Sequence, residues 1–376
     1  MSEIVARIGD GVRSFDAADW DACAGSDNPF LSHAFLSALE ESGSATPRTG
    51  WQAAPIAIDG ANGKPLAVMP AYLKSHSQGE YVFDHGWASA YERAGGHYYP
   101  KLQIAVPFTP VPGRRLLTTE PQLAQGLIAA AETLVENNGL SSAHATFVHA
   151  DEVPVFERAG WLIRIDSQFH WHNDGYGSFE DFLGSLSSRK RKAIRKERRE
   201  ALEGLTVEHF TGAAITEAHW DAFWRFYQDT GSRKWGRPYL TRRFFSLLGE
   251  RLADRVLLVF ALRGGVPIAG ALNLIGEDTL YGRYWGTTAE VPHLHFEICY
   301  YQAIDAAIAR GLKRVEAGAQ GEHKLSRGYR PVPTFSAHYL ADPRLRAAVA
   351  DFLDAERRAI EHEIHVLDTM TPFRKA

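Results

Sequence analysis

Cysteine is scarce in this chain of 376 residues, which contains only Cys23 and Cys299. Two cysteines exclude a disulfide framework and a metal site built from thiolates alone, and they are typical of a reducing compartment. Long hydrophobic runs are also missing. No stretch approaches the roughly 20 apolar residues that a membrane helix needs, and the first residues contain no apolar segment of signal-peptide length. We therefore expect a soluble, cytoplasmic protein.

Net charge is small as well, at −4, and gives no global sign of a nucleic-acid-binding protein. It is unevenly distributed, however. Within residues 189–200, eight side chains are basic and two acidic, so this segment carries +6 and the remainder of the chain −10. We predict a helix over residues 178–203. It is either a solvated arm that keeps the chain soluble or, as the acidic remainder favours, a helix that contacts phosphates through Arg189, Lys190, Arg191, Lys192 and Arg195.

Length and composition indicate two folded domains. A chain of 376 residues exceeds one compact core, and 45% hydrophobic residues with 23% charged residues exclude disorder. An internal repeat supports this division. Pro29-Phe30-Leu31-Ser32, with Phe35 and Leu39 behind it, recurs at the same spacing as Pro238-Tyr239-Leu240-Thr241, Phe244 and Leu248.

Each copy continues with the same predicted elements. They are a β-hairpin (55–70 and 256–275), an aromatic strand (81–83 and 280–285), a long helix that ends at glycine (122–138 and 295–310) and a further strand. This order predicts an α/β (α+β) fold in which each copy has a mixed, mostly antiparallel sheet with flanking helices. Turn residues near 173–177 place the domain boundary there, giving an N-terminal domain over 1–173 and a C-terminal domain over 174–376.

Three polar runs in the second copy are candidates for chemistry, and the first lies on the predicted strand 280–286. With the two-residue alternation of a strand, Tyr281, Arg283 and Trp285 share one face. An arginine on a central strand needs an anion or a carboxylate as a partner. Arg283 is therefore either half of a structural ion pair or a ligand-binding residue.

The second run opens the predicted helix 295–310, where Glu297 and Tyr301 fall on one stripe at helical spacing. The lower part of that stripe is core, so Glu297 is either buried and paired or at the lip of a cleft. In a cleft its pKa would rise and it could act as a base. His295 and a second histidine two residues earlier raise the question of a metal, but their spacing matches no common zinc signature, and we predict no metal site.

The third run, residues 316–329, combines glycine with polar side chains. Gly318 and Gly321 allow the backbone to approach a ligand closely, although a polar surface loop remains the alternative. The Gly-Lys-Ser or Gly-Lys-Thr ending of a phosphate-binding loop is absent. The candidate site residues of this run are Glu316, Gln320, Glu322, His323, Lys324, Arg327 and Tyr329. A separate basic and aromatic cluster, able to stack on a ligand and pair with it, consists of Lys234, Trp235 and Arg237.

These runs closely resemble the FemAB-like family of predicted N-acyltransferases, most specifically from Phe179 to Leu353. The matching motifs in the second copy are residues 189–192, 234–241, 269–273, 280–286, 294–297, 318–324 and 327–329. The first copy fits through residues 28–31 and 84–101, so the resemblance covers nearly the whole chain.

The resemblance implies a tandem pair of acetyltransferase-like (GNAT) domains, in agreement with the repeat. It also relates the chain to the peptidoglycan-branching aminoacyltransferases, which move an amino acid from aminoacyl-tRNA to an amine of a peptidoglycan precursor. One departure concerns the donor. The Arg/Gln-x-x-Gly-x-Gly/Ala loop that binds acetyl-CoA in acetyltransferases is not evident, because residues 289–293 occupy its place. This weakens the expectation of acetyl-CoA.

We therefore predict an N-acyltransferase that moves an acyl or aminoacyl group onto an amine, with aminoacyl-tRNA or acyl-CoA as the donor. The alternatives are a non-catalytic protein that recognises a cell-wall precursor or RNA, and an acyl-CoA-dependent acetyltransferase. Covalent catalysis has no visible candidate, since Cys299 falls inside a helix and is expected in the core. The first copy lacks an equivalent of residues 320–324 and is expected to give structural support.

Roles follow from the chemistry of amide formation, which needs a base for the amine and donors for the oxyanion. The candidate bases are Glu297, Glu316, Glu322 and His323. The groups predicted to hold anions are Arg283, Lys324 and Arg327, and those predicted to orient the acceptor are Gln320 and Tyr329. The other candidate substrate-binding residues are Trp285, His295, Tyr301, Lys234, Trp235 and Arg237.

Overall fold

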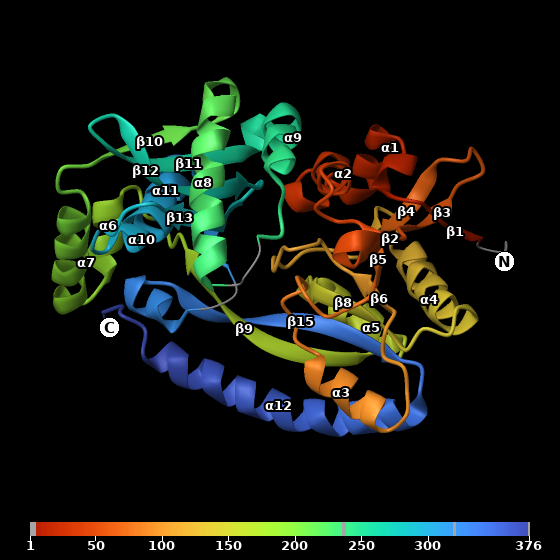
Figure 1. The fold of residues 1–376 in the computed structure, drawn as a ribbon. Helices are drawn as coiled ribbons and strands as arrows, with labels where there is room; N and C mark the ends of the chain where they lie inside the picture. Colours follow the sequence, from red (N-terminus) through yellow and green to blue (C-terminus); the bar gives the residue numbers. More distant parts are fainter. Residues whose placement is uncertain (1–4, 235–237, 319–320, 375–376) are drawn as a thin grey trace. The chain divides into compact units, whose positions relative to one another are not determined.

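The computed structural model describes residues 5–234, 238–318 and 321–374, without the side chains of residues 230–234 and 322 (Figure 1). Two compact units share the chain. Unit 1 consists of Met1–Asp166 and Pro333–His362, and unit 2 consists of Ser167–Val332 and Glu363–Ala376.

Unit 1 contains two groups of strands with helices beside them. The first group pairs antiparallel in the order β1 (Ala6–Ile8), β3 (Ile56–Asp59), β4 (Pro65–Met69) and β7 (Leu117–Thr118). The second is β2 (Trp51–Ala53), β5 (Ala71–Lys74), β6 (Lys101–Ile104), β8 (Ser142–Val148) and β15 (Arg330–Leu340). The helices are α1 (Ala17–Ala24), α2 (His33–Glu41), α3 (His85–Arg93), α4 (Pro121–Asn137), α5 (Val153–Arg158) and α12 (Pro343–Thr369), whose last turns belong to unit 2.

Apolar side chains of α4 form much of the core of unit 1. Leu127, Ile128 and Ala131 recur at helical spacing and are buried against strand residues that include Leu102 and Ala143. Burying such a stripe is the main source of stability for a helix of this length. It also fixes α4 as the connection between β6 and β8, which pair in parallel.

Unit 2 has one sheet in the order β10, β11, β12, β13, β14 and β9. Only the pair β13–β14 is parallel. The strands are β9 (Leu162–His172), which begins in unit 1, β10 (Thr206–Phe210), β11 (Val256–Arg263), β12 (Val266–Ile275), β13 (Thr279–Thr287) and β14 (Arg314–Glu316). The helices are α6 (Phe179–Ser185), α7 (Ser188–Ala201), α8 (Glu217–Lys234), α9 (Arg242–Leu252), α10 (Leu294–Phe296), the π-helix η7 (Glu297–Tyr301), α11 (Gln302–Ala309) and the 3₁₀ helix η8 (Glu322–Arg327).

The two units repeat one connection, which confirms the predicted duplication and the mixed α/β fold. In unit 1 the parallel strands β6 and β8 flank α4, and in unit 2 the parallel strands β13 and β14 flank the continuous run α10–η7–α11. In unit 2, α8 packs on β12 and β13 (Figure 1). Gly286 permits this close approach, because a Cβ there would lie 2.0 Å from the carbonyl oxygen of Phe226.

The structure differs from the sequence prediction in three places. Residues 81–83 form no strand but lie between β5 and α3, with Tyr81 at a positive φ of 59°. The predicted helix 178–203 is two helices, because Leu186 is fully buried in an extended conformation and pairs with Phe373. The chain also passes between the units at three points, after residues 166, 332 and 362, whereas the prediction of a single boundary at 173 treats each copy as one segment.

Candidate functional site

A hollow opens in unit 2 where β13 and β14 separate. The two strands pair only from Thr279 to Tyr281, opposite Arg314–Glu316. Parallel strands that part in mid-sheet leave backbone and side chains available to a ligand. The hollow has a volume of about 130 Å³ and is lined by Ala271, Leu272, Asn273, Gly282, Arg283, Tyr284, Trp285, His295, Cys299, Tyr300 and Ala317.

A β-bulge shapes the wall that β13 contributes. Leu272 lies opposite Tyr284 and Asn273 opposite Gly282, so Arg283 is the extra residue of the bulge. A bulge re-aims side chains and is frequent beside active sites. The strict alternation expected for Tyr281, Arg283 and Trp285 is therefore interrupted, and four consecutive residues from 282 to 285 all border the hollow.

The opposite wall comes from a helix with a π-helical turn. η7 places Cys299 and Tyr300 on the hollow, and His295 precedes it in α10. Such single π turns are concentrated at functional sites. The Trp285 and His295 rings lie 4.9 Å apart and join the two walls. Both rings also line a second, more open groove of about 540 Å³, which extends over the loop 287–293.

Lys324 in η8 has an unusual environment for a lysine. Its side chain is 1% exposed, and its Nζ donates a hydrogen bond to the carbonyl oxygen of Gly318 at 2.8 Å. Burial lowers the pKa of Lys324 to about 7, with an opposing effect from Cys299 and a further lowering by the charge of Arg283. Both of these neighbours line the hollow. Lys324 is thus a buried lysine whose pKa is lowered into the neutral range and whose neighbours line the hollow.

Glu316 is a second buried group that titrates near neutrality. Burial raises the pKa of Glu316 to about 7, against the lowering effects of the Arg314 and Arg283 charges. Its Oε1 lies 3.8 Å from Nδ1 of His170 and 3.7 Å from Nε of Arg314. His170, on β9, is one residue that the sequence analysis missed. Only sheet register brings it beside Glu316.

His323 and Tyr329 meet the same wall from the loop side. Nε2 of His323 lies 2.8 Å from the hydroxyl oxygen of Tyr300, and the Tyr329 and Tyr300 rings are 5.6 Å apart. The predicted strand, helix and loop segments therefore converge. Arg283, Trp285 and His295 line the hollow itself, while Lys324, His323, Glu316 and Tyr329 surround it.

Three other predicted residues are held in contacts away from the hollow. Glu297 is completely buried, accepts two hydrogen bonds from Arg198 and receives a third from Gln302. Tyr301 donates a hydrogen bond to Glu197, which also binds Arg327. Of the two interpretations offered for Glu297, the structure has the buried, paired one, and its carboxylate is not presented to a ligand.

The basic helix α7 exposes most of its cationic side chains. Arg189, Lys192 and Arg195 are exposed, and Lys190 and Arg191 are half-buried. Arg195 pairs with Glu180. The remaining predicted residues, Gln320, Trp235 and Arg237, lie outside the described residues, as do the side chains of Lys234 and Glu322. In the part of the chain that the structure describes, no three His, Cys, Asp or Glu side chains gather as a metal site would require.

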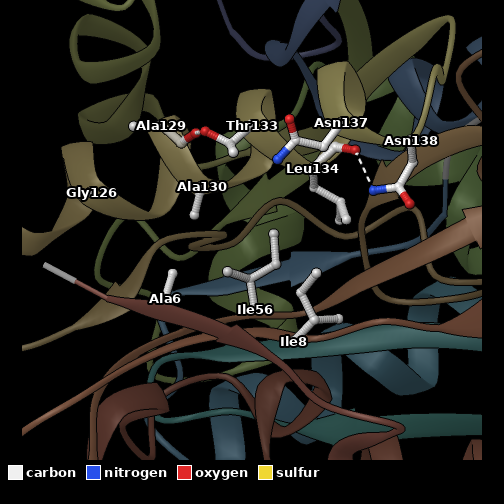
Figure 2. Close-up of a pocket in the computed structure, with 10 residues that line it drawn as sticks. All are labelled: Ala6, Ile8, Ile56, Gly126, Ala129, Ala130, Thr133, Leu134, Asn137 and Asn138. Carbon is white, nitrogen blue, oxygen red and sulfur yellow. Dashed lines mark hydrogen bonds between the residues drawn. The ribbon is translucent and has the colours of Figure 1, made fainter.

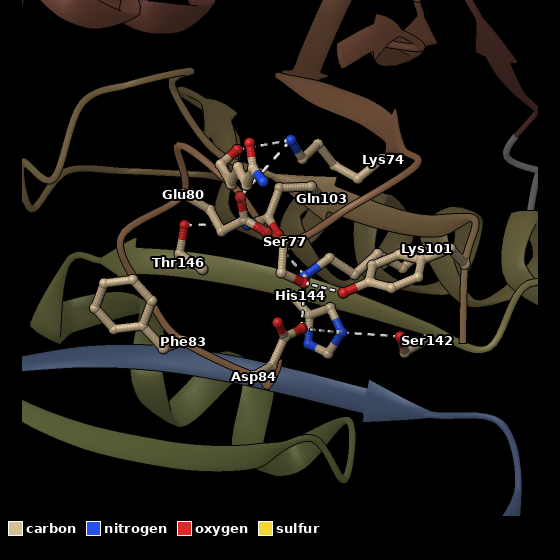
Figure 3. Close-up of polar contacts among 12 residues, drawn as sticks. Lys74, Ser77, Glu80, Phe83, Asp84, Lys101, Gln103, Ser142, His144 and Thr146 are labelled. Carbon is tan, nitrogen blue, oxygen red and sulfur yellow. Dashed lines mark hydrogen bonds and ion pairs between the residues drawn. The ribbon is translucent and has the colours of Figure 1, made fainter. Parts of the chain in front are cut away.

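Unit 1 contains a buried polar network that joins β5, β6 and the segment between β5 and α3 (Figure 3). Nζ of Lys101 lies 2.5 Å from Asp84, 2.9 Å from Glu80 and 2.8 Å from the hydroxyl oxygen of Ser77. Lys74 lies 3.7 Å from Glu80. All these side chains are almost fully buried.

Sheet register relates this network to the site in unit 2. Across the parallel pair and its antiparallel neighbour, Tyr281, Glu316 and His170 lie in one row in unit 2. In unit 1 the corresponding set of strands, a parallel pair and its antiparallel neighbour, has Gln103, His144 and His338 in one row. Each copy therefore carries titratable groups at the centre of its sheet, a relation that no sequence motif indicates.

We expect His144 and His338 in unit 1 to make the stability of the protein sensitive to acid. Nδ1 of His144 lies 2.7 Å from Nδ1 of His338, so one ring donates to the other. Burial and the Lys101 charge lower the pKa of His144 to about 3, and burial and the neighbouring His144 hold the pKa of His338 well below its usual range. Unfolding lets both bind protons below about pH 6.5. The free energy of unfolding should therefore fall by about 1.4 kcal/mol per histidine per pH unit from pH 6.5 to 4.5.

Urea unfolding at a series of pH values measures this slope. The variant His144→Gln/His338→Gln should be less stable at neutral pH and should lose the part of the slope that these two histidines contribute. The buried His170, whose pKa burial also lowers well below its usual range, should keep its own contribution. An unchanged slope in that variant would assign the acid sensitivity to other groups.

An apolar groove in unit 1 has no such chemistry. It has a volume of about 550 Å³ and lies between β1, β3 and α4 (Figure 2). Its walls are aliphatic apart from a few neutral polar side chains such as Thr133 and Asn137.

Among the described residues, no helix is both long enough and apolar enough to cross a membrane.

Comparison with known families decides the affiliation of the chain. The model of the FemAB-like family, described as peptidoglycan biosynthesis/recognition, matches residues 11–375. The chain belongs to the FemAB-like family. This confirms the resemblance found in the sequence.

Solved structures confirm the fold of this FemAB-like protein. A crystal structure of FemX has a TM-score of 0.56 at 12% identity, covering 89% of this chain and 98% of FemX. L-PGS from Bacillus licheniformis has a TM-score of 0.51 at 10% identity, covering 94% and 99%. The C-terminal domain of a putative lysylphosphatidylglycerol synthetase from Agrobacterium fabrum also gives 0.51 at 10% identity, covering 84% and 97%. No curated protein matches the sequence significantly.

Proposed function

We propose that the hollow of unit 2 is the acyl-transfer site of this FemAB-like protein and that Lys324 is the group that moves the proton. The observation that carries the proposal is a fully buried lysine whose pKa is lowered to about 7 and whose neighbours, Cys299 and Arg283, border the hollow. An amine with such a pKa changes its protonation state at little cost at physiological pH.

The chemistry needs one base that can return its proton. The neutral amine of Lys324 takes a proton from the acceptor ammonium, and the freed nitrogen attacks the carbonyl carbon of the donor. A C–N bond forms and the bond between the carbonyl carbon and the leaving oxygen or sulfur breaks. The Lys324 ammonium then gives its proton to that leaving atom, and the second proton of the attacking nitrogen passes to solvent. The reaction therefore releases one proton, and the enzyme ends in its starting state.

The walls of the hollow supply binding groups of different kinds. The guanidinium of Arg283 can hold an anionic group or the developing oxyanion, and Trp285 and His295 offer ring surfaces at the junction with the larger groove. Tyr329 and His323 support Tyr300 from behind the wall. Glu297, Tyr301 and Arg327 have no role in binding in this proposal, because their polar groups are used within the protein.

The exposed cations of α7 support an aminoacyl-tRNA as the donor. Several Lys and Arg side chains on one helix attract a polyanion, and α7 packs against α10, which borders the site. A peptidoglycan precursor carrying a free amine is the acceptor that fits the family description. A tRNA donor would place the reaction in the cytoplasm.

A transfer assay with the full chain tests the donor and the site together. Bulk tRNA charged with a radiolabelled amino-acid mixture, or radiolabelled acetyl-CoA, is incubated with a peptidoglycan precursor. We expect label to reach the precursor from tRNA, with a steep loss of rate as salt rises. Transfer from acetyl-CoA alone, with a rise in melting temperature on adding coenzyme A, would instead identify an acetyltransferase.

The pH dependence of the transfer rate identifies the base. If neutral Lys324 accepts the proton, kcat/KM should rise about tenfold per pH unit up to about pH 7 and then level off. Because burial also raises the pKa of Glu316 to about 7, the variant Glu316→Gln separates the two groups. The rise of kcat/KM below pH 7 should persist in Glu316→Gln. If this variant loses the rise, Glu316 is the base.

A further inference from the structure

Helix α7 has a second side, which packs against the segments that carry the site residues. Two consecutive residues of opposite charge, Glu197 and Arg198, reach two different segments of unit 2. One segment is η8, which carries Lys324, and the other is the run α10–η7–α11, which carries Cys299 and Tyr300.

Glu197 fixes η8 through Arg327. Nη2 of Arg327 donates to both carboxylate oxygens of Glu197 at 3.0 Å. The same guanidinium lies 3.4 Å from the centroid of the Phe296 ring and donates to the carbonyl oxygen of His323 at 2.8 Å. Arg327 is only 6% exposed, so the ion pair is well shielded from water.

Arg198 fixes the helical wall through Glu297. Its Nε and Nη2 donate to the two oxygens of Glu297 at 3.0 and 2.9 Å, and Nη2 also reaches Asp305 at 2.7 Å. The fork-to-fork geometry fixes orientation as well as distance. Glu297 lies within one helical turn of Cys299 and Tyr300, both on the hollow.

We propose that Glu197 and Arg198 are positioning residues of the acyl-transfer site, which tie both of its walls to one helix. The inference rests on the proposed function, because it concerns the placement of Lys324 against the hollow. Buried ion pairs are weak evidence for stability, since desolvation offsets much of the attraction. Two such pairs from adjacent residues do, however, define the separation between η8 and the helical wall.

The ion pair of Arg327 fixes the position of Lys324, because the two residues are close neighbours in η8. Arg327 follows Lys324 by three residues, and the amide of Tyr329 donates to the carbonyl oxygen of Lys324 at 3.3 Å. The charged or titratable groups that act on Lys324 come from η7 (Cys299), β13 (Arg283) and β9 (His170). Releasing Arg327 would let η8 move away from these groups and admit water to the amine.

The main experiment measures Lys324 directly in the full chain. Trace acetic anhydride is applied from pH 5 to 11, and acetylation of Lys324 is quantified by mass spectrometry. In wild type the midpoint should lie near 7. In Glu197→Gln it should move upward by about one pH unit or more, toward the value of a hydrated lysine. The matched control is Glu203→Gln, which removes the same charge from an exposed residue just beyond α7.

Kinetics provide the second measurement. Glu197→Gln should lower kcat by about tenfold to a hundredfold with KM changed less than about threefold, because positioning acts on the reacting geometry. Arg198→Lys keeps the charge but loses the fork, so it should fall between wild type and Arg198→Gln. Once Arg327→Met has removed the partner, adding Glu197→Gln should cause no further loss in kcat.

Two outcomes overturn the inference. The first is a wild-type midpoint and kcat in both Glu197→Gln and Arg198→Gln. The second is equal losses in Arg198→Lys and Arg198→Gln with no shift in the Lys324 midpoint. If Lys324→Met retains full transfer activity, the proposed function fails instead, and the two failures are therefore distinguishable. Should Glu197→Gln fail to fold, Arg198→Lys carries the same test.

Discussion

Replacing Lys324 by methionine is expected to lower kcat by a factor of about 10² to 10⁴, the usual loss when a general acid–base group is removed. Methionine has nearly the same length and is apolar, so it suits a site that is 1% exposed. The melting temperature should stay the same or rise, because an amine that is costly to bury is removed. A large loss of activity without loss of stability is the signature of a catalytic group.

The matched control is Lys313→Met. Lys313 is exposed and directly precedes strand β14. This variant should keep wild-type kcat. Activity of Lys324→Met close to wild type would show that the proton is transferred by another group. Glu316 would then be the remaining buried candidate in the described part of the site.

Replacing Lys101 by methionine should destabilise the protein by about 3–5 kcal/mol, since it leaves buried carboxylates without their cation. Asp84 and Glu80 both lie within 3 Å of its Nζ. The substitution removes no group from the hollow of unit 2. The folded fraction should therefore keep its activity, and urea unfolding would measure the loss.

Two comparisons make this result specific. Lys64→Met breaks an ion pair with Asp19 at 2.7 Å whose lysine is 61% exposed, and it should destabilise the protein far less than Lys101→Met does. Lys101→Met/Asp84→Asn should cost less than the sum of its single changes, because the unpaired charge is removed with its partner. If the losses of stability in the two single variants simply add in the double variant, Lys101 and Asp84 are not coupled in a network.

Patterns in the sequence were sufficient for the fold because they are local. The repeated Pro-aromatic-Leu-Ser/Thr start depends on an N-cap that the structure has in both copies, with Ser32 and Thr241 accepting from the amides of Phe35 and Phe244. Helix 122–138 and the hairpin 256–275 follow from periodicity and turn residues, and α4 and β11–β12 confirm them. The aromatic triplet 81–83 was predicted wrongly as a strand, because tertiary packing decided its conformation.

The site was less accessible to such reasoning. Lys324 and Arg283 stand in conspicuous polar runs, so they could be named. Their roles depend on burial and on the bulge at Arg283, which period-two alternation does not reveal. His170 becomes a neighbour of Glu316 only through strand pairing across 146 residues of chain. Glu297 was an equally strong candidate in the sequence. The structure shows that its carboxylate accepts hydrogen bonds from Arg198, which is far from it in the sequence.

The two copies differ in what occupies the centre of the sheet. In unit 2 the strands part beside Arg283, and a hollow remains. In unit 1 the row of Gln103, His144 and His338 is buried, and the buried Lys101 network lies beside it. This contrast supports chemistry in the second copy and structural support from the first.

The most direct test of the account is the titration of the Lys324 amine itself, followed by NMR with ¹⁵N-labelled lysine and assigned with Lys324→Met. The account predicts a midpoint near pH 7. An ammonium that stays protonated above pH 9, as an ordinary lysine does, would contradict the assignment of Lys324 as the group that accepts and returns the proton.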